Sequence, residues 1–230
     1  MQYAFLIGSL FLFLIWLFIF LKLKLKENKT EMIQASFATS LLGLTEPIFV
    51  PDYWNPPTLF DLAQKTRFDI ESLIFAFAVG GIAVSAYEIF YKQEHRKITM
   101  HEMHNQRHRF HLWALLASPI SFMFFFVLTP LNPIYSTMLS LTIGALATFY
   151  CRPDLVKKMI TSAIIFFLIY FLFFVMFNIL FPGYTQQVWN LKALSRILII
   201  GVPIEELGFA FALGLMWSSI YEHIKWQKLA

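Results

Sequence analysis

The chain has 230 residues, of which 58% are apolar and 14% charged, and its mean hydropathy is +0.64. Soluble globular proteins are close to half apolar and about one quarter charged, so this composition excludes an ordinary soluble domain and predicts that lipid solvates much of the surface. The single cysteine excludes an internal disulfide. The net charge of +4 does not indicate a nucleic-acid partner, because the basic residues of a membrane protein report its topology.

Seven apolar segments predict seven transmembrane helices, since a helix needs about 20 apolar residues to cross a bilayer. The second segment is the weakest, because it contains several polar residues. The first has no basic residues before its apolar run and no small-residue cleavage site, so we expect it to be retained as a span. The segments lie at about residues 3–21, 32–50, 69–91, 110–130, 134–151, 157–181 and 195–224.

The connections between these segments divide the basic residues unequally. Of the 18 Lys and Arg residues, 14 fall in the connections after the first, third and fifth segments or at the C-terminus, which all lie on one side. The positive-inside rule makes that side cytoplasmic. We therefore expect an integral membrane protein of the bacterial cytoplasmic membrane, with its N-terminus outside and its C-terminus in the cytoplasm.

Two of the segments repeat one another. Residues 69–90 and 203–224 agree at 11 of 22 positions, and a Trp-Asn pair recurs upstream of each copy. The copies are the third and seventh segments, so both cross the membrane in the same direction, which makes a parallel repeat. We expect an all-α fold in three parts: a three-helix repeat at 1–91, a cytoplasmic His-rich loop with a linker helix at 92–131, and a second three-helix repeat at 132–230.

Each copy of the repeat begins with acidic residues. Glu71 stands in the first turn of the first copy, and Glu205 and Glu206 follow a helix-breaking Gly201-Val202-Pro203 in the second. The helix dipole favours carboxylates there, so capping is one explanation. If the chain is helical from Arg196, however, Glu205 begins about 14 Å further along the helix, at 1.5 Å per residue. A carboxylate that deep in hydrocarbon is a functional hypothesis by default.

Aromatic residues follow the acids in both copies. Their simplest role is packing between helices, but ring faces can also line a cavity and stabilise a cation. A protonated carboxyl beside aromatic faces suits acid chemistry on a hydrocarbon. Glu46, at the outer end of the second segment, lies at the depth of the first acid. We expect these side chains to line a substrate site: Phe75, Phe77, Phe209, Phe211, Trp54, Trp189 and Glu46.

Histidines concentrate in the loop between the third and fourth segments. The spacing of His101, His104, His108 and His111 places them on one face of a helix, which is compatible with a zinc or iron site. Membrane di-iron oxygenases need several separated His clusters, and this chain has one. We therefore favour a polar loop near anionic lipid, with no cofactor, and keep the four histidines as candidate metal ligands.

The repeated segments resemble the membrane-embedded lycopene cyclases, both the heterodimeric bacterial type and its fused archaeal and fungal relatives. The resemblance rests on PIEE at 203–206 opening a Phe-rich helix, the Trp-Asn pair before it, the degenerate copy DIES at 69–72, and the three-one-three arrangement. It implies an isomerase that protonates the terminal double bond of a linear carotene, closes a six-membered ring and removes a proton, without redox change. It also implies that Glu205 and Glu206 are the acid and base, with Glu71 as their counterpart.

The residues leave two other interpretations open. The chain can be a non-catalytic carotenoid-binding or isoprenoid-binding membrane protein, or a small transporter, that uses the interface between the repeats. It can also be an enzyme with a metal at the histidine face. In each case the expected partners are membrane lipid and a hydrophobic isoprenoid, and the oligomeric state is not predicted.

Overall fold

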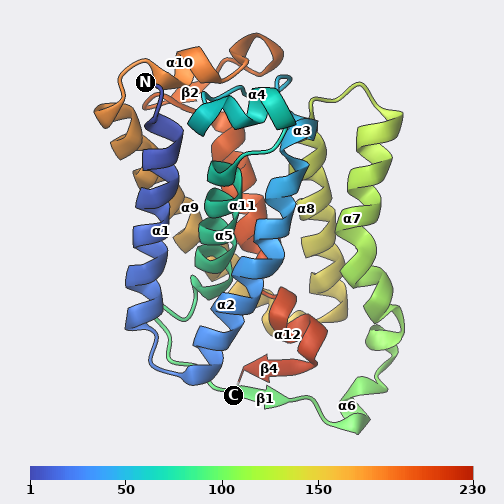
Figure 1. The fold of residues 1–230 in the computed structure, drawn as a ribbon. Helices are drawn as coiled ribbons and strands as arrows, with labels where there is room; N and C mark the ends of the chain where they lie inside the picture. The colour runs from blue at the N-terminus through green and yellow to red at the C-terminus, as the bar shows by residue number, and fades with distance from the viewer. Residues whose placement is uncertain (230) are drawn as a thin grey trace.

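The structure, a computed structural model, describes residues 1–229, and it is mostly helical (Figure 1). The long helices form a bundle: α1 (Ala4–Lys22), α2 (Lys26–Ser40), α5 (Ile70–Ser85), α7 (His111–Leu128), α8 (Pro133–Cys151), α9 (Val156–Leu180) and α11 (Ile204–Trp217). Short helices lie at the two ends: α3 (Glu46–Phe49), α4 (Leu62–Thr66), α6 (Met100–Met103), α10 (Tyr184–Val188) and α12 (Ile220–Lys225). Four short strands complete the fold: β1 (His95–Lys97), β2 (Leu198–Ile199), β3 (Val202–Pro203) and β4 (Gln227–Leu229).

Within residues 1–229, four helices are long and apolar enough to cross a membrane: α1, α7 with the 3₁₀ turn before it, α8 and α9. A fifth candidate is α5 together with the helical segment before it, Leu59–Thr66, although the two are bent by 94°. The predicted segments 32–50 and 195–224 are not continuous helices. The first contains the end of α2, the 3₁₀ turn Leu41–Thr45 and α3, and the second begins with the β2–β3 hairpin.

Helices α5 and α11 occupy the middle of the bundle. Helix α5 packs against α1 and α2, and α11 packs against α8 and α9. Glycines allow the close approach of α2 to α5, because a Cβ at Gly80 or Gly81 would lie 2.0 or 2.2 Å from side-chain atoms of Thr39 and Ser36. Helix α7 stands at the edge and contacts mainly α8 (Figure 1).

Apolar side chains cover much of the outside of the bundle. On α7, for example, Trp113 is 63% exposed and Leu128 is 68% exposed. Large exposed apolar surface is unfavourable in water, so these side chains fit a lipid environment, as the composition predicted.

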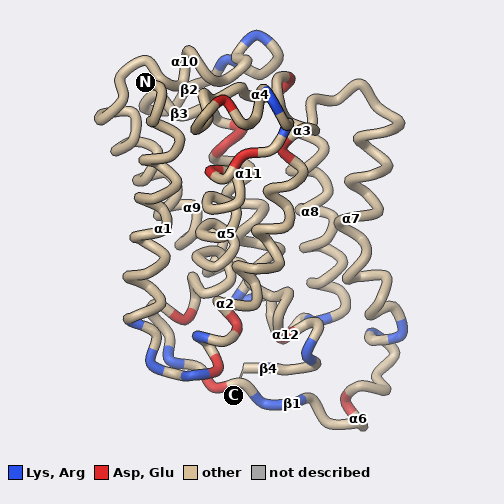
Figure 2. Tube along the Cα trace, in the orientation of Figure 1, with Lys and Arg blue, Asp and Glu red and all other residues tan. Residues whose placement is uncertain are grey.

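The two ends of the bundle differ in charge. The N-terminus lies at the end that carries α4, α10 and the β2–β3 hairpin, which we call the α10 end. The opposite end carries α12 and the antiparallel pair of β1 and β4, which we call the β1–β4 end. Figure 2 shows most of the basic residues at the β1–β4 end. The basic residues assigned to one side from sequence therefore gather at one end of the fold.

Candidate functional site

The two glutamates of the second copy are set in place by a sharp reversal of the chain. The β2–β3 hairpin turns through Ile200 and Gly201, which both have positive φ, and α11 begins at Ile204 directly after Pro203. The predicted helix start is therefore confirmed to within one residue. The predicted 14 Å of helix from Arg196 to the acids is wrong, because LIIGVP pairs with itself as a hairpin.

Successive residues of a helix point about 100° apart, so Glu205 and Glu206 face different surroundings. Glu206 points into the bundle and is 5% exposed. One of its carboxylate oxygens accepts hydrogen bonds from the Tyr53 hydroxyl and, at 3.0 Å, from the Trp189 indole. The other oxygen accepts a hydrogen bond from the Tyr170 hydroxyl at 2.8 Å. Three fixed donors thus hold one buried carboxylate.

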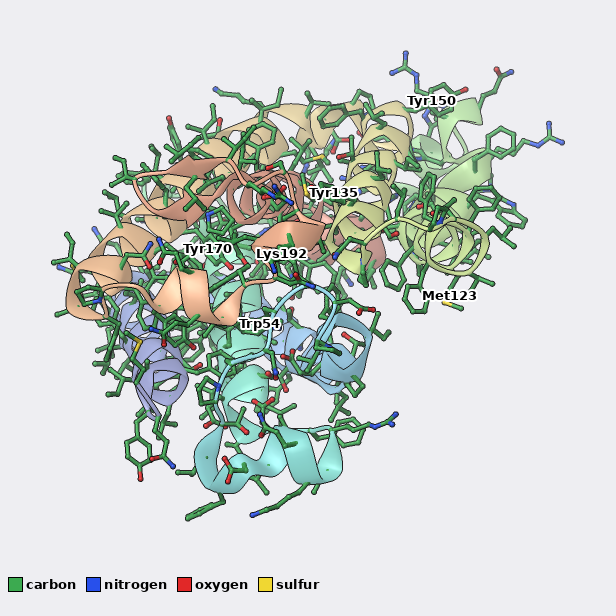
Figure 3. The ribbon with its side chains drawn as sticks, turned by 90° about the horizontal axis from the view of Figure 1, so that it is seen from above. Trp54, Met123, Tyr135, Tyr150, Tyr170 and Lys192 are labelled. Carbon is green, nitrogen blue, oxygen red and sulfur yellow. The ribbon has the colours of Figure 1, made fainter. Side chains whose placement is uncertain are left out.

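The donors of Glu206 come from separate parts of the chain. Tyr53 follows α3, Tyr170 lies in α9, and Trp189 follows α10. Burial and the adjacent Glu206 carboxylate raise the pKa of the Tyr53 hydroxyl well above its usual range, so Tyr53 remains a donor. Viewed from the α10 end, Trp54 and Tyr170 lie over the middle of the bundle, whereas Met123 lies out on α7 (Figure 3).

Glu205 faces a different side of α11 and is 2% exposed. One oxygen of its carboxylate accepts hydrogen bonds from the Tyr135 hydroxyl at 2.6 Å and from the backbone N–H of Ser195 at 2.8 Å. Its other oxygen is buried and has no hydrogen-bond partner within residues 1–229. Glu205 therefore keeps one carboxyl oxygen available for a further contact.

That carboxyl borders an apolar groove of about 800 Å³ formed by α8, α9, α11 and the β2–β3 hairpin. Ile164, Leu168 and Phe211 line it and are each more than 40% exposed, so the groove opens on the outer surface of the bundle. Glu205, Tyr135 and Ser195 are its polar lining residues. A groove of this size, apolar except at Glu205 and its two hydrogen-bond partners, can hold a hydrocarbon group.

The acids of the first copy lie elsewhere. One oxygen of Glu71 accepts a hydrogen bond from the backbone N–H of Leu59 at 2.6 Å, and the other is buried without a partner among the described residues. Glu46 is 7% exposed, with one oxygen also unpartnered within the described chain. Neither residue lines the groove beside Glu205. The structure therefore does not bring Glu71 and Glu205 to one cavity.

The aromatic residues that the sequence predicted to line a substrate site lie in three separate places. The Trp54 and Trp189 rings lie 5.5 Å apart, and Phe75 and Phe209 lie 6.3 and 6.5 Å from the Tyr170 ring. These four form one cluster around the donors of Glu206. Phe211 lines the groove. Phe77 instead packs between α1 and α2, with ring centroids 5.0 Å from Trp16 and 5.3 Å from Phe37.

A second buried polar cluster lies at the β1–β4 end, and the sequence reasoning did not foresee it. The Lys158 ammonium, with a side chain that is 0% exposed, contacts Glu88 at 2.7 Å, Glu31 at 3.1 Å and also Glu222. His95 contacts the same Glu222 at 3.0 Å. Glu88 and Glu222 are equivalent positions of the repeat, which is the signal that could have revealed the cluster.

The four candidate histidine ligands do not share one helix, so the prediction of a common helical face is wrong. A capping box between Thr99 and Glu102 starts α6, which ends after one turn, and Asn105 caps a separate 3₁₀ turn. His101 and His104 therefore lie on a different element from His108 and His111. The capping sequence Thr-x-x-Glu was the available signal for this break.

A comparison with known protein families finds a match in the C-terminal part of the chain. The family model described as lycopene cyclase matches residues 132–224. Residues 132–224, less than half of the chain, are therefore similar to the lycopene cyclase family. The match supports a lycopene cyclase-like function in general terms. No curated protein and no solved structure matches the chain.

The lycopene cyclase segment contains the groove and most of the Glu206 site. It spans α8, α9 and α11, so it supplies Tyr135, Tyr170 and both glutamates. Tyr53, which completes the hydrogen bonding of Glu206, lies before this segment. The first part of the chain is therefore needed to complete the site that the family segment begins. The tyrosines that bind the two carboxylates were not found from sequence, because none of them lies in the repeated motif.

Proposed function

We propose that this protein cyclises the end group of a linear carotenoid in a proton-initiated, non-redox reaction at the groove beside Glu205. The observation that carries the proposal is that Glu205, which has one buried carboxyl oxygen without a partner among the described residues, lines the apolar groove. A bilayer-dissolved hydrocarbon can reach this groove from the lipid side, because its lining residues are exposed on the surface of the bundle.

In the proposed reaction, Glu205 donates a proton to the terminal double bond of the substrate. The resulting tertiary carbocation is attacked by a neighbouring double bond, which closes a six-membered ring and moves the positive charge into the ring. Loss of a proton from an adjacent ring carbon then forms a new double bond. One proton enters and one leaves, so the product is an isomer of the substrate and no redox partner is consumed.

The roles of the two glutamates follow from their surroundings. Glu205 has a free oxygen at the groove, which suits the proton-transferring group. Glu206 is held by three neutral donors, which stabilise its ionised form, and its negative charge on the residue next to Glu205 favours the cationic intermediate. We assign to Glu206 the role of the base, or of a negative charge that stabilises the cation. We assign to Glu71 the role of the structural counterpart of these acids in the first repeat.

We also propose seven transmembrane helices in a parallel repeat, with the β1–β4 end in the cytoplasm. Helices α1, α2 and α5 correspond to α8, α9 and α11, and each central helix packs against the two others of its own unit. The segments that precede the two central helices form a reciprocal pair of backbone hydrogen bonds. The Asn55 N–H donates to the Val188 carbonyl at 2.8 Å, and the Asn190 N–H donates to the Tyr53 carbonyl at 2.9 Å. These paired contacts support a twofold relation between the units.

Expression in lycopene-accumulating cells tests the activity, with pigments separated by chromatography. We expect cyclised carotenoid from the wild type, none from Glu205→Gln, and a strong decrease with Glu206→Gln. The matched control is Glu94→Gln, because Glu94 is exposed and distant from the groove. Unchanged lycopene in the presence of intact wild-type protein would refute the cyclisation. Lycopene that copurifies unchanged with the protein would support a binding protein instead.

A further inference from the structure

Two histidines and the only cysteine converge at the β1–β4 end. His108 lies in the 3₁₀ turn before α7, His111 is the first residue of α7, and Cys151 is the last residue of α8. The Cys151 Sγ lies 3.7 Å from Nδ1 of His108 and 3.8 Å from Nδ1 of His111. The candidate ligand atoms of the three residues all lie within 4.8 Å of one another.

Both Nδ1 atoms approach the sulfur at almost equal distances. A thiol has one proton, so it can donate to only one of the two imidazoles, and its sulfur is a weak acceptor for the other. A cation at the centre would satisfy all three atoms together. With Zn–S near 2.3 Å and Zn–N near 2.0–2.1 Å, a tetrahedral site separates sulfur from nitrogen by about 3.6 Å. The observed separations exceed that value by only 0.1–0.2 Å.

The surroundings partly cover the three side chains. Cys151 is 0% exposed, and His108 and His111 are half-buried. The Trp226 ring stacks on His111 with a centroid separation of 3.7 Å and meets His108 edge-on at 5.3 Å. The nearby cation Arg152 is engaged by Asp154, with Nε 2.9 Å from its carboxylate, and by backbone carbonyls, so it does not leave an uncompensated positive charge beside the sulfur.

A third histidine gives an independent indication of a missing ligand. His223 of α12 is 0% exposed, and its ring lies 4.4 Å from that of His111. Its Nδ1 lies 3.5 Å from the Thr148 hydroxyl, whereas its Nε2 has no hydrogen-bond partner among residues 1–229. Burying an unpartnered polar nitrogen is costly, and a metal or a metal-bound water next to it would remove that cost.

We propose that Cys151, His108 and His111 bind a Zn²⁺ ion, with the fourth position open toward His223. Cysteine sulfur and histidine nitrogen are typical ligands of zinc, which is usually four-coordinate and tetrahedral in proteins. The ion would join the start of α7 to the end of α8. Because α7 contacts mainly α8 and is otherwise peripheral, this bond would fix the base of the outermost helix and the C-terminal segment that covers it.

Metal analysis of the full chain, purified in detergent from zinc-supplemented cells, tests the site. We expect about one zinc per chain in the wild type. Cys151→Ser and the double variant His108→Ala/His111→Ala should each lower the zinc content at least tenfold. The matched control is His101→Ala/His104→Ala, which removes the two histidines of the same loop that lie outside the cluster and should keep the full zinc content.

Cobalt keeps the test independent of folding yield and of cyclase activity. Metal-free wild-type protein titrated with Co²⁺ should develop a thiolate-to-cobalt charge-transfer band in the near ultraviolet. Cys151→Ser, eluting from size exclusion as the wild type does, should lack the band. A wild type that contains no zinc and gives no cobalt band would overturn the proposal. A band that persists in Cys151→Ser would overturn the assignment of the sulfur ligand.

Discussion

Lys158→Met should lower the free energy of unfolding strongly, because it removes a buried charge at the β1–β4 end. The Lys158 ammonium is the shared partner of three buried carboxylates, on Glu31, Glu88 and Glu222. At an effective dielectric constant near 20, one such pair at about 3 Å has a Coulomb energy of about 5–6 kcal/mol. Removing the ammonium leaves the carboxylates buried without that compensation.

The size of the loss can be bounded. Breaking a buried ion pair by removing one partner costs about 3–5 kcal/mol. A freed carboxyl can instead take up a proton, which at pH 7 costs about 3.7 kcal/mol for an ordinary glutamic acid with a pKa near 4.3. We therefore expect the free energy of unfolding to fall by about 3–5 kcal/mol at pH 7. Because protonation costs only about 1 kcal/mol at pH 5, the deficit relative to wild type should shrink as the pH falls.

Unfolding in mixed micelles, driven by increasing SDS and followed by tryptophan fluorescence and far-ultraviolet circular dichroism, measures the loss. The matched control is Lys157→Met, since Lys157 is the neighbouring residue and is exposed, so its effect should stay within about 0.5 kcal/mol. Adding Glu88→Gln to Lys158→Met should restore part of the stability by removing one uncompensated charge. Equal stability of Lys158→Met and Lys157→Met would refute the reasoning.

Two further variants probe the packing around the site. Tyr170→Phe removes one of the three donors to Glu206, so the free energy of unfolding should fall by about 1.5–3 kcal/mol and the initial rate of carotenoid cyclisation should drop. The control is Tyr150→Phe, because the Tyr150 side chain is 63% exposed. Equal stability and activity of the two variants would contradict this prediction. Gly81→Ala places a Cβ 2.2 Å from the Trp16 indole nitrogen, so overpacking should cost about 1–3 kcal/mol in the same unfolding assay, and an unchanged unfolding midpoint would show that the helices can separate freely.

Local chemistry determined where α11 begins. Gly201 takes a positive φ, Pro203 stops the preceding segment, and the acids fall in the first turn of α11, as their order in the sequence predicted. Local chemistry did not decide the state of the residues just before it. A short apolar run such as LIIG is compatible with a helix and with a strand. In the structure it forms a strand, because β2 pairs with β3 across a tight turn.

The sequence by itself determined that lipid surrounds much of this protein, that its basic residues gather at one end, and that a few acids lie within apolar sequence. These features follow from composition and spacing, which are properties of the chain alone. Only the tertiary structure decided what each acid contacts. Glu205 and Glu206 are neighbours in sequence, yet one borders a lipid-facing groove and the other is held by three buried donors. The donor Tyr53 lies 153 residues before Glu206, and no periodicity reports a contact at that separation, because it arises from the packing of one half of the bundle against the other.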